Sequence, residues 1–114
     1  MSGWKQLLHV NHHSFLPWLK QWFPYADRRL AGATLDKGDV SGIPGVTIEI
    51  KNHAKMNLAG WVAELETEMD NDKAWTGTVL HKRKGTSDVG QWYCTMPASV
   101  WIDLLRRAQN GGQT

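Results

Sequence analysis

The chain has 114 residues and a net charge of +2 at neutral pH, with 41% hydrophobic and 21% charged residues. This composition is that of one ordinary globular domain, and it excludes a disordered chain, a collagen-like fibre and a disulfide-rich scaffold. No apolar run approaches the roughly 18 residues that a membrane span needs. The single cysteine, Cys94, has no partner for an internal disulfide. We therefore expect a cytoplasmic domain with no membrane partner.

The first predicted element is a short amphipathic helix, opened by Ser14 and stopped by Pro24. Its apolar side chains recur at helical spacing, at Phe15, Trp18, Leu19 and Trp22. We assign residues 1–114 to a single domain. It comprises a variable N-terminal helix over 1–25, a core over 26–108 and a frayed tail over 109–114.

Glycines and prolines between Arg28 and Lys51 predict short strands joined by tight turns. The clearest strand covers residues 46–51. Its apolar residues alternate with polar ones, so we expect the apolar face to contact the core. We expect Thr47, Glu49 and Lys51 to lie on the opposite, polar face of the sheet.

The second half of the chain predicts two helices and a hairpin. The helix after Asn57 carries an apolar stripe from Leu58 to Met69, and its glutamates, including Glu64 and Glu68, lie mostly off that stripe. Residues 76–82 and 91–96 predict strands joined through the turn-rich segment 84–90. Pro97 opens a last helix whose apolar side faces the core. We also expect core positions for Cys94, Trp92 and Trp101. The order is α-β-β-β-α-β-β-α, an α/β class with a small mixed sheet flanked by helices.

Three polar residues around the predicted strand 46–51 carry the chemistry. Glu49 and Lys51 share one face, because side chains two residues apart point the same way. Asp39 precedes a turn that folds the chain back toward Glu49. Two converging carboxylates need a cation, and their hard oxygen ligands favour Mg²⁺ or Mn²⁺. Lys51 can orient or deprotonate an attacking water and offset charge on a phosphate.

The motif Asp39 followed by Glu49-Ile50-Lys51 resembles that of the PD-(D/E)XK nuclease superfamily. Further segments resemble the small Holliday-junction-resolvase-like proteins of actinobacterial phages, roughly over residues 23–105. These segments are Arg28-Arg29, Gly38-Asp39-Val40, Gly42-Ile43-Pro44-Gly45, Asn52-His53, Trp61, His81-Lys82-Arg83-Lys84-Gly85 and Met96-Pro97.

The resemblance implies a restriction-endonuclease-like fold and a metal-dependent endodeoxyribonuclease. Asp39, Glu49 and the backbone carbonyl of Ile50 would ligate the metal, and Lys51 would serve the nucleophilic water. Cleavage would leave a 5′-phosphate and a 3′-hydroxyl. The implied substrate is branched or double-stranded DNA, and the implied assembly is a homodimer with one site per cut strand.

Basic residues near the motif are the candidates for holding the DNA backbone. They form three groups in the sequence. We expect nucleic-acid contacts from Arg28, Arg29, His53, Lys55, His81, Lys82 and Arg83.

One departure from the family pattern leaves alternatives open. Family members commonly carry a glutamate on the first helix, and this chain has no acidic residue before Asp27. Asn11, His12 or His13 would have to take that place. The alternative functions are a catalytically inactive DNA-binding module and a phage regulatory, protein-binding module on the same fold.

Overall fold

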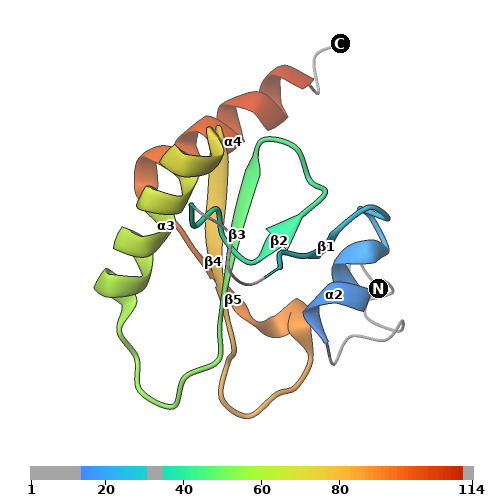
Figure 1. Ribbon diagram of the computed structural model, residues 1–114, viewed down its shortest axis with the longest axis vertical. Coiled ribbons are helices and arrows are strands. Elements are labelled where there is room, and N and C mark those ends of the chain that lie inside the picture. Colours follow the sequence, from blue (N-terminus) through green and yellow to red (C-terminus); the bar gives the residue numbers. More distant parts are fainter. Residues whose placement is uncertain (1–13, 31–34, 112–114) are drawn as a thin grey trace.

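The computed structural model describes residues 14–30 and 35–111. Within these residues the chain is a mixed α/β domain with small sheets (Figure 1). Its helices and strands are, in chain order, α2 (Phe15–Lys20), β1 (Asp27–Arg28), β2 (Val40–Ser41), β3 (Val46–Lys51), α3 (Leu58–Asp72), β4 (Thr76–His81), the 3₁₀ turn η2 (Val89–Gln91), β5 (Tyr93–Thr95) and α4 (Ala98–Gly111).

The main sheet has the order β3-β4-β5, with β3 parallel to β4 and β4 antiparallel to β5. Helix α3 makes the crossover that a parallel pair requires. Its predicted cap is confirmed, since the Asn57 side chain accepts a hydrogen bond from the Gly60 amide. The predicted hairpin is also confirmed, although β5 is shorter than expected because η2 takes up its first residues. Strands β1 and β2 form a separate two-stranded ribbon, where we expected one sheet.

Both faces of β3 are covered. Ile48 packs with α2 residues in one apolar cluster, and α3 covers the other face with Trp61 and Leu65 packed on Val79 (Figure 1). Thr47 and Glu49 are therefore buried, although they lie on the face that was predicted to be polar. The physical reason is the parallel pairing, because a βαβ crossover places its helix over the sheet. Glu49 consequently faces a helix rather than water.

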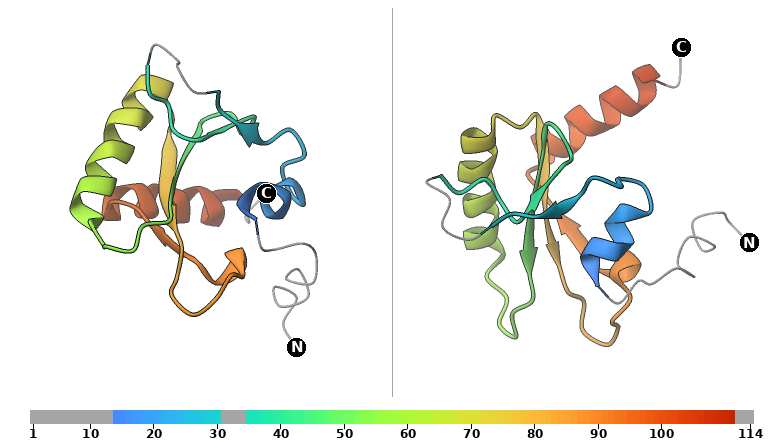
Figure 2. Two further views of the ribbon diagram at one scale, coloured as in Figure 1. Left: turned by 60° about the horizontal axis from the view of Figure 1, so that its bottom comes forward. Right: turned by 45° about the vertical axis from the view of Figure 1, so that its right-hand side comes forward.

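Helix α4 was expected to bury its apolar side, and it does not. None of its residues is buried, and Trp101, Ile102 and Leu105 are exposed. The helix runs through Gly111, so the predicted tail over 109–114 begins too early, and its last turns project beyond the sheet (Figure 2). Cys94 is exposed as well, because β5 is an edge strand. None of the described helices has the length and apolar content needed to cross a bilayer.

The packing of α3 on the sheet generates the first prediction. Leu65 is fully buried between Trp61 and Val79. Leu65→Ala should lower the free energy of unfolding by about 2–5 kcal/mol, because the substitution leaves a cavity. Urea denaturation measures this change. Leu30→Ala is the control, since Leu30 is 90% exposed, and an equal loss in both variants would contradict the packing described.

Candidate metal centre

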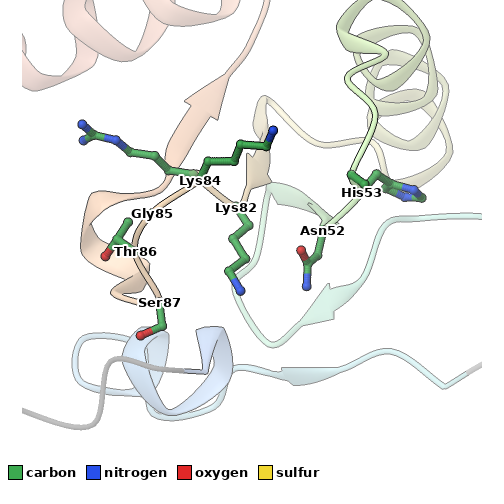
Figure 3. A pocket seen from close by; sticks show the side chains of 9 residues that line it. Asn52, His53, Lys82, Lys84, Gly85, Thr86 and Ser87 are labelled. Carbon is green, nitrogen blue, oxygen red and sulfur yellow. The ribbon is translucent and has the colours of Figure 1, made fainter.

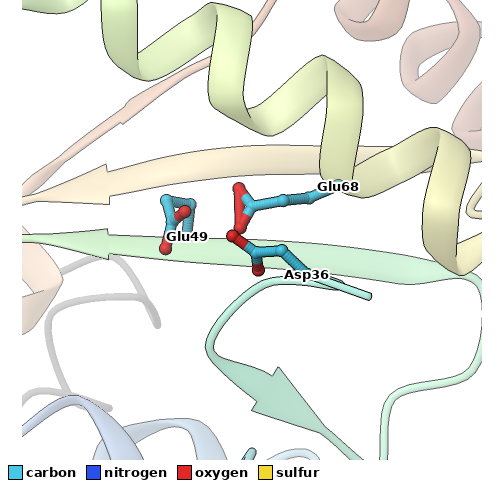
Figure 4. A group of neighbouring side chains, drawn as sticks. All are labelled: Asp36, Glu49 and Glu68. Carbon is cyan, nitrogen blue, oxygen red and sulfur yellow. The ribbon is translucent and has the colours of Figure 1, made fainter. Parts of the chain in front are cut away.

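Three carboxylates from three different segments converge between β3 and α3. Glu49 comes from β3, Glu68 from α3 and Asp36 from the loop before β2 (Figure 4). One oxygen of each lies within 4.8 Å of the others. Glu49 is 5% and Glu68 1% exposed, whereas Asp36 lies at the exposed rim. We call these three residues the acidic cluster.

The acidic cluster has an excess of acceptors. Both carboxylate oxygens of Glu68 are buried and receive no hydrogen bond in the described part of the chain. Buried polar atoms are normally satisfied, so an orphaned carboxylate requires a proton or a cation. Burial, together with Asp39 and Glu68, raises the pKa of Glu49 to about 10. Burial also raises the pKa of Glu68 to about 7, with Asp36 and Asp39 adding to the effect.

A glycine turn brings the loop to β3. Gly38 has φ +91°, and a side chain there would contact Thr47 and the Ile48 carbonyl. Only glycine adopts this conformation readily, and its missing Cβ lets the loop lie against the strand. The Asp36 side chain accepts the Gly38 amide at 3.0 Å, and its carbonyl accepts from Asn71 at 2.8 Å. The loop is thereby attached to both the turn and α3.

Asp39 lies beside Glu49, as the sequence predicted, but in a different role from Asp36. Its amide donates to the Ile48 carbonyl at 2.9 Å, and its Oδ2 accepts the Ile50 amide at 2.7 Å. Asp39 thus hydrogen-bonds to the backbone of Ile48 and Ile50 along the edge of β3 that faces away from β4. Asp39 is next to the acidic cluster, and one of its oxygens is already engaged by the backbone.

Lys51 forms a 2.8 Å ion pair with Glu64 of α3. Burial lowers the pKa of Lys51, but Glu64 and the carboxylates of Glu49 and Asp39 outweigh it and raise the pKa above its ordinary value. Lys51 is therefore a stable cation at neutral pH. This favours an electrostatic role over proton abstraction from water.

The sequence interpretation missed Asp36 and Glu68. Glu68 had a signal, because it follows Trp61 and Leu65 at helical spacing and so belongs to the buried face of α3. The prediction that Glu68 lies off the apolar stripe of this helix was therefore wrong. Asp36 had no such signal, since only the turn at Gly38 brings it to the strand.

The acidic cluster fits a small divalent cation. All of its ligand atoms are carboxylate oxygens, the hard donors that Mg²⁺ and Mn²⁺ prefer. The unsatisfied oxygens of Glu68 face Glu49 and Asp36 rather than a basic side chain (Figure 4). Burial, and then the neighbouring carboxylates, disfavour the charged form of both glutamates, and a bound cation would offset both effects.

The basic residues at the carboxyl ends of β3 and β4 line one cavity of about 580 Å³ (Figure 3). The predicted residues His53, Lys82 and Arg83 are among its lining. We call it the basic pocket, and its full lining is Asn52, His53, Ala54, Lys82, Arg83, Lys84, Gly85, Thr86 and Ser87.

Other predicted DNA contacts lie elsewhere. His81 is buried, with its Nε2 at 2.8 Å from the Thr95 hydroxyl, and burial lowers its pKa, so it is not a phosphate ligand. The rings of Trp61 and Tyr93, with centroids 5.4 and 5.5 Å from that of His81, cover its side chain. Arg29 pairs with Asp72 at 3.3 Å, and Arg28 stacks on Phe15. Lys55 is exposed outside the pocket lining.

The residues considered for the missing first-helix carboxylate, Asn11, His12 and His13, lie outside the described residues. Comparison of the chain with protein-family models, curated proteins and solved structures found no match.

The acidic cluster generates a pH prediction for the protein without divalent cations. A carboxyl whose pKa is raised by folding stabilises the fold below its ordinary pKa of 4.5 and loses that contribution as pH rises through the folded value. For Glu68 the loss should centre between 4.5 and about 7. Glu68→Gln should reduce the loss in this range, because the amide is neutral and can donate to Glu49, while Glu49, whose pKa is raised to about 10, still contributes a loss of the same sign.

Chemical denaturation in EDTA across this pH range measures the effect. Glu66→Gln is the matched control, because Glu66 is exposed on the same helix. If Glu68→Gln showed the wild-type pH dependence, the orphaned carboxylate would not be the cause.

Proposed function

We propose that the protein is a Mg²⁺-dependent, structure-selective DNA endonuclease that hydrolyses phosphodiester bonds, on a restriction-endonuclease-like fold. The observation that supports it most is the buried, donor-free carboxylate of Glu68 facing Glu49 and Asp36. Lys51 and Asp39 lie beside this acidic cluster, in agreement with the resemblance of the motif. The basic pocket follows directly along the chain.

In this proposal Asp36, Glu49 and Glu68 hold the cation, and Asp39 and the Ile50 carbonyl complete its ligands. A bound Mg²⁺ would offset charge on the scissile phosphate and lower the pKa of an attacking water. The structural feature that the chain itself supplies is preorganisation. The carboxylates are fixed by β3, α3 and the Gly38 turn before substrate arrives.

Lys51 acts on the phosphate as a cation. Its raised pKa keeps it protonated, and its side chain is 14% exposed, so its charge is poorly screened by water. A fixed positive charge that stabilises the developing negative charge is typically worth a factor of about 10²–10³ in rate. The geometry favours this role over that of a general base.

Cleavage assays test the proposal with a four-way junction and a plain duplex, each with Mg²⁺, Mn²⁺ or EDTA. Lys51→Ala should lower the cleavage rate about 10²–10³-fold, and Lys51→Arg should retain more activity because it keeps the charge. Asp39→Asn and Glu68→Gln should also lower it. Lys73→Asn is the control, since Lys73 is exposed at the far end of α3 and has the positive φ that Asn tolerates.

Metal-dependent cutting that is lost in these variants supports the proposal. Salt-sensitive binding without any cutting would contradict the enzyme and favour the inactive DNA-binding alternative. Cutting that is unaffected by Lys51→Ala would contradict the role given to this residue.

We propose a homodimer as the assembly, with α4 as its contact. Trp101, Ile102 and Leu105 leave an apolar face uncovered, and α4 carries Asp103 together with Arg106 and Arg107. Asp103 and Arg107 pair with each other within the helix, so the apolar face supplies the contact, and a two-fold axis would pack this face against its own copy. The same face would suit the protein-binding alternative.

Light scattering during size-exclusion chromatography tests the dimer. Trp101→Glu should shift the wild-type dimer toward monomer, because a charge would be buried at the interface. Tyr25→Glu is the control, since Tyr25 is equally an exposed aromatic residue far from α4 in sequence. A monomeric wild-type chain at the concentrations tested would contradict the dimer.

A further inference from the structure

The basic pocket is a concavity between two loops rather than a flat surface. It is bounded by the segment after β3 and by the segment after β4, whose carboxyl ends lie at one edge of the sheet (Figure 3). Its volume, about 580 Å³, is within the range of pockets that enclose small ligands. A rigid double helix can present only its outer phosphates to the rim of such a concavity, whereas a flexible unpaired strand can place a nucleotide inside it.

The cations of the basic pocket have no carboxylate partner. Among the described residues, no ion pair involves Lys82, Lys84 or Arg83, in contrast to Arg29, Lys51 and Arg107. Asn52 and Thr86 add side chains that can hydrogen-bond to phosphate oxygens. Gly85 has nothing within 4 Å of a built Cβ, so a ligand can approach its backbone closely. The pocket therefore offers positive charge and hydrogen-bond donors to an anion from outside the chain.

A column of aromatic rings in tilted contact connects the two sides of the pocket. His53 contacts Trp61, Trp61 contacts His81, and His81 contacts Tyr93, with ring centroids 5.7, 5.4 and 5.5 Å apart. Arg83 then stacks over Tyr93 at 5.6 Å. The column begins at one lining residue and ends at another, through α3, β4 and β5. The buried His81 thus supports the pocket from within.

The pocket also lies close to the acidic cluster. Asn52 is three residues beyond Glu49 on the same extended segment, a separation of roughly 10 Å at the rise of a strand. Lys51 lies between them, with its side chain toward α3. A DNA strand whose phosphate is at the acidic cluster can therefore continue into the pocket within a few nucleotides.

We propose that the basic pocket binds the phosphates of an unpaired DNA strand next to the cut site, and so selects branched DNA over plain duplex. The inference rests on the proposed nuclease function for its biological meaning. The binding step can be tested separately from nuclease activity, because strand binding in the pocket needs neither the metal nor cleavage. Lys82 and Lys84 supply the charge, and the ring column holds the site open.

The test measures binding in EDTA, so that cutting cannot interfere. Fluorescently labelled DNAs are titrated with the full chain: a single strand, a blunt duplex, and the same duplex with a single-stranded tail. The wild type should bind the tailed duplex and the single strand more tightly than the blunt duplex. The double variant Lys82→Ala/Lys84→Ala should lose that preference. Both lysines are exposed, so the variant should fold.

The salt dependence gives a second readout. Removing two phosphate contacts to a single strand should reduce the slope of log affinity against log salt by about 1.4, so a fourfold rise in salt weakens the wild type about sevenfold more than the double variant. Lys73→Asn is the matched control for charge, and it lies at the opposite end of α3. Its slope and preference should match the wild type.

The outcomes separate this inference from the nuclease proposal. Strand preference that disappears in the double variant supports the pocket, whether or not the protein cuts DNA. Equal binding of tailed and blunt duplex, or an equal effect of Lys73→Asn, would overturn it even if cleavage is observed. Equally tight binding of a free mononucleotide would also overturn it, because the pocket would then serve a small ligand.

Discussion

The burial of Glu49 is the constraint on which the site depends. The parallel pairing of β3 with β4 requires a crossover, and the crossover helix α3 covers the face on which Glu49 lies. Glu68 of α3 then faces Glu49, and among the described residues no basic side chain or backbone amide donates to the Glu68 carboxylate. This electrostatic cost is confined to one point of the contact between α3 and the sheet. The rest of that contact is apolar, with Leu65 and Val79 fully buried, and its stabilisation offsets the cost. A cation would turn the cost into a stabilising interaction.

The same strand pairing arranges charge of the opposite sign nearby. Because β3 and β4 run parallel, their carboxyl ends lie together, and the segments that follow both strands are basic. The acidic cluster lies along the strand and the basic pocket beyond its end. Such a separation suits a polyanion that needs a cation at one phosphate and lysines at others. A random scatter of surface charge would not place Lys51 between the two.

The sequence was sufficient for elements with a strong local pattern. The alternation over 46–51 and the Asn57 cap predicted β3 and the start of α3. Prediction from the sequence failed where tertiary contacts determine which side chains are buried. Trp101 has the helical spacing of a core residue and is exposed, because α4 packs on β4 through another side and leaves the Trp101 side uncovered. His81 belongs to a basic run and is buried, because the run starts on a central strand. Asp36 reaches the site only through the Gly38 turn.

In the proposed function, the ion pair of Lys51 with Glu64 couples the site to its substrate. In the structure Glu64 neutralises Lys51, yet Glu64 is half exposed and Lys51 is not. An exposed partner contributes little net stability and is easily released. A phosphate arriving beside the acidic cluster carries the same charge as Glu64 and offers more than one acceptor oxygen, so it can take over the interaction with Lys51. Glu64 would then move into water at small cost, and the partly buried ammonium of Lys51 would pass from a structural partner to the scissile phosphate.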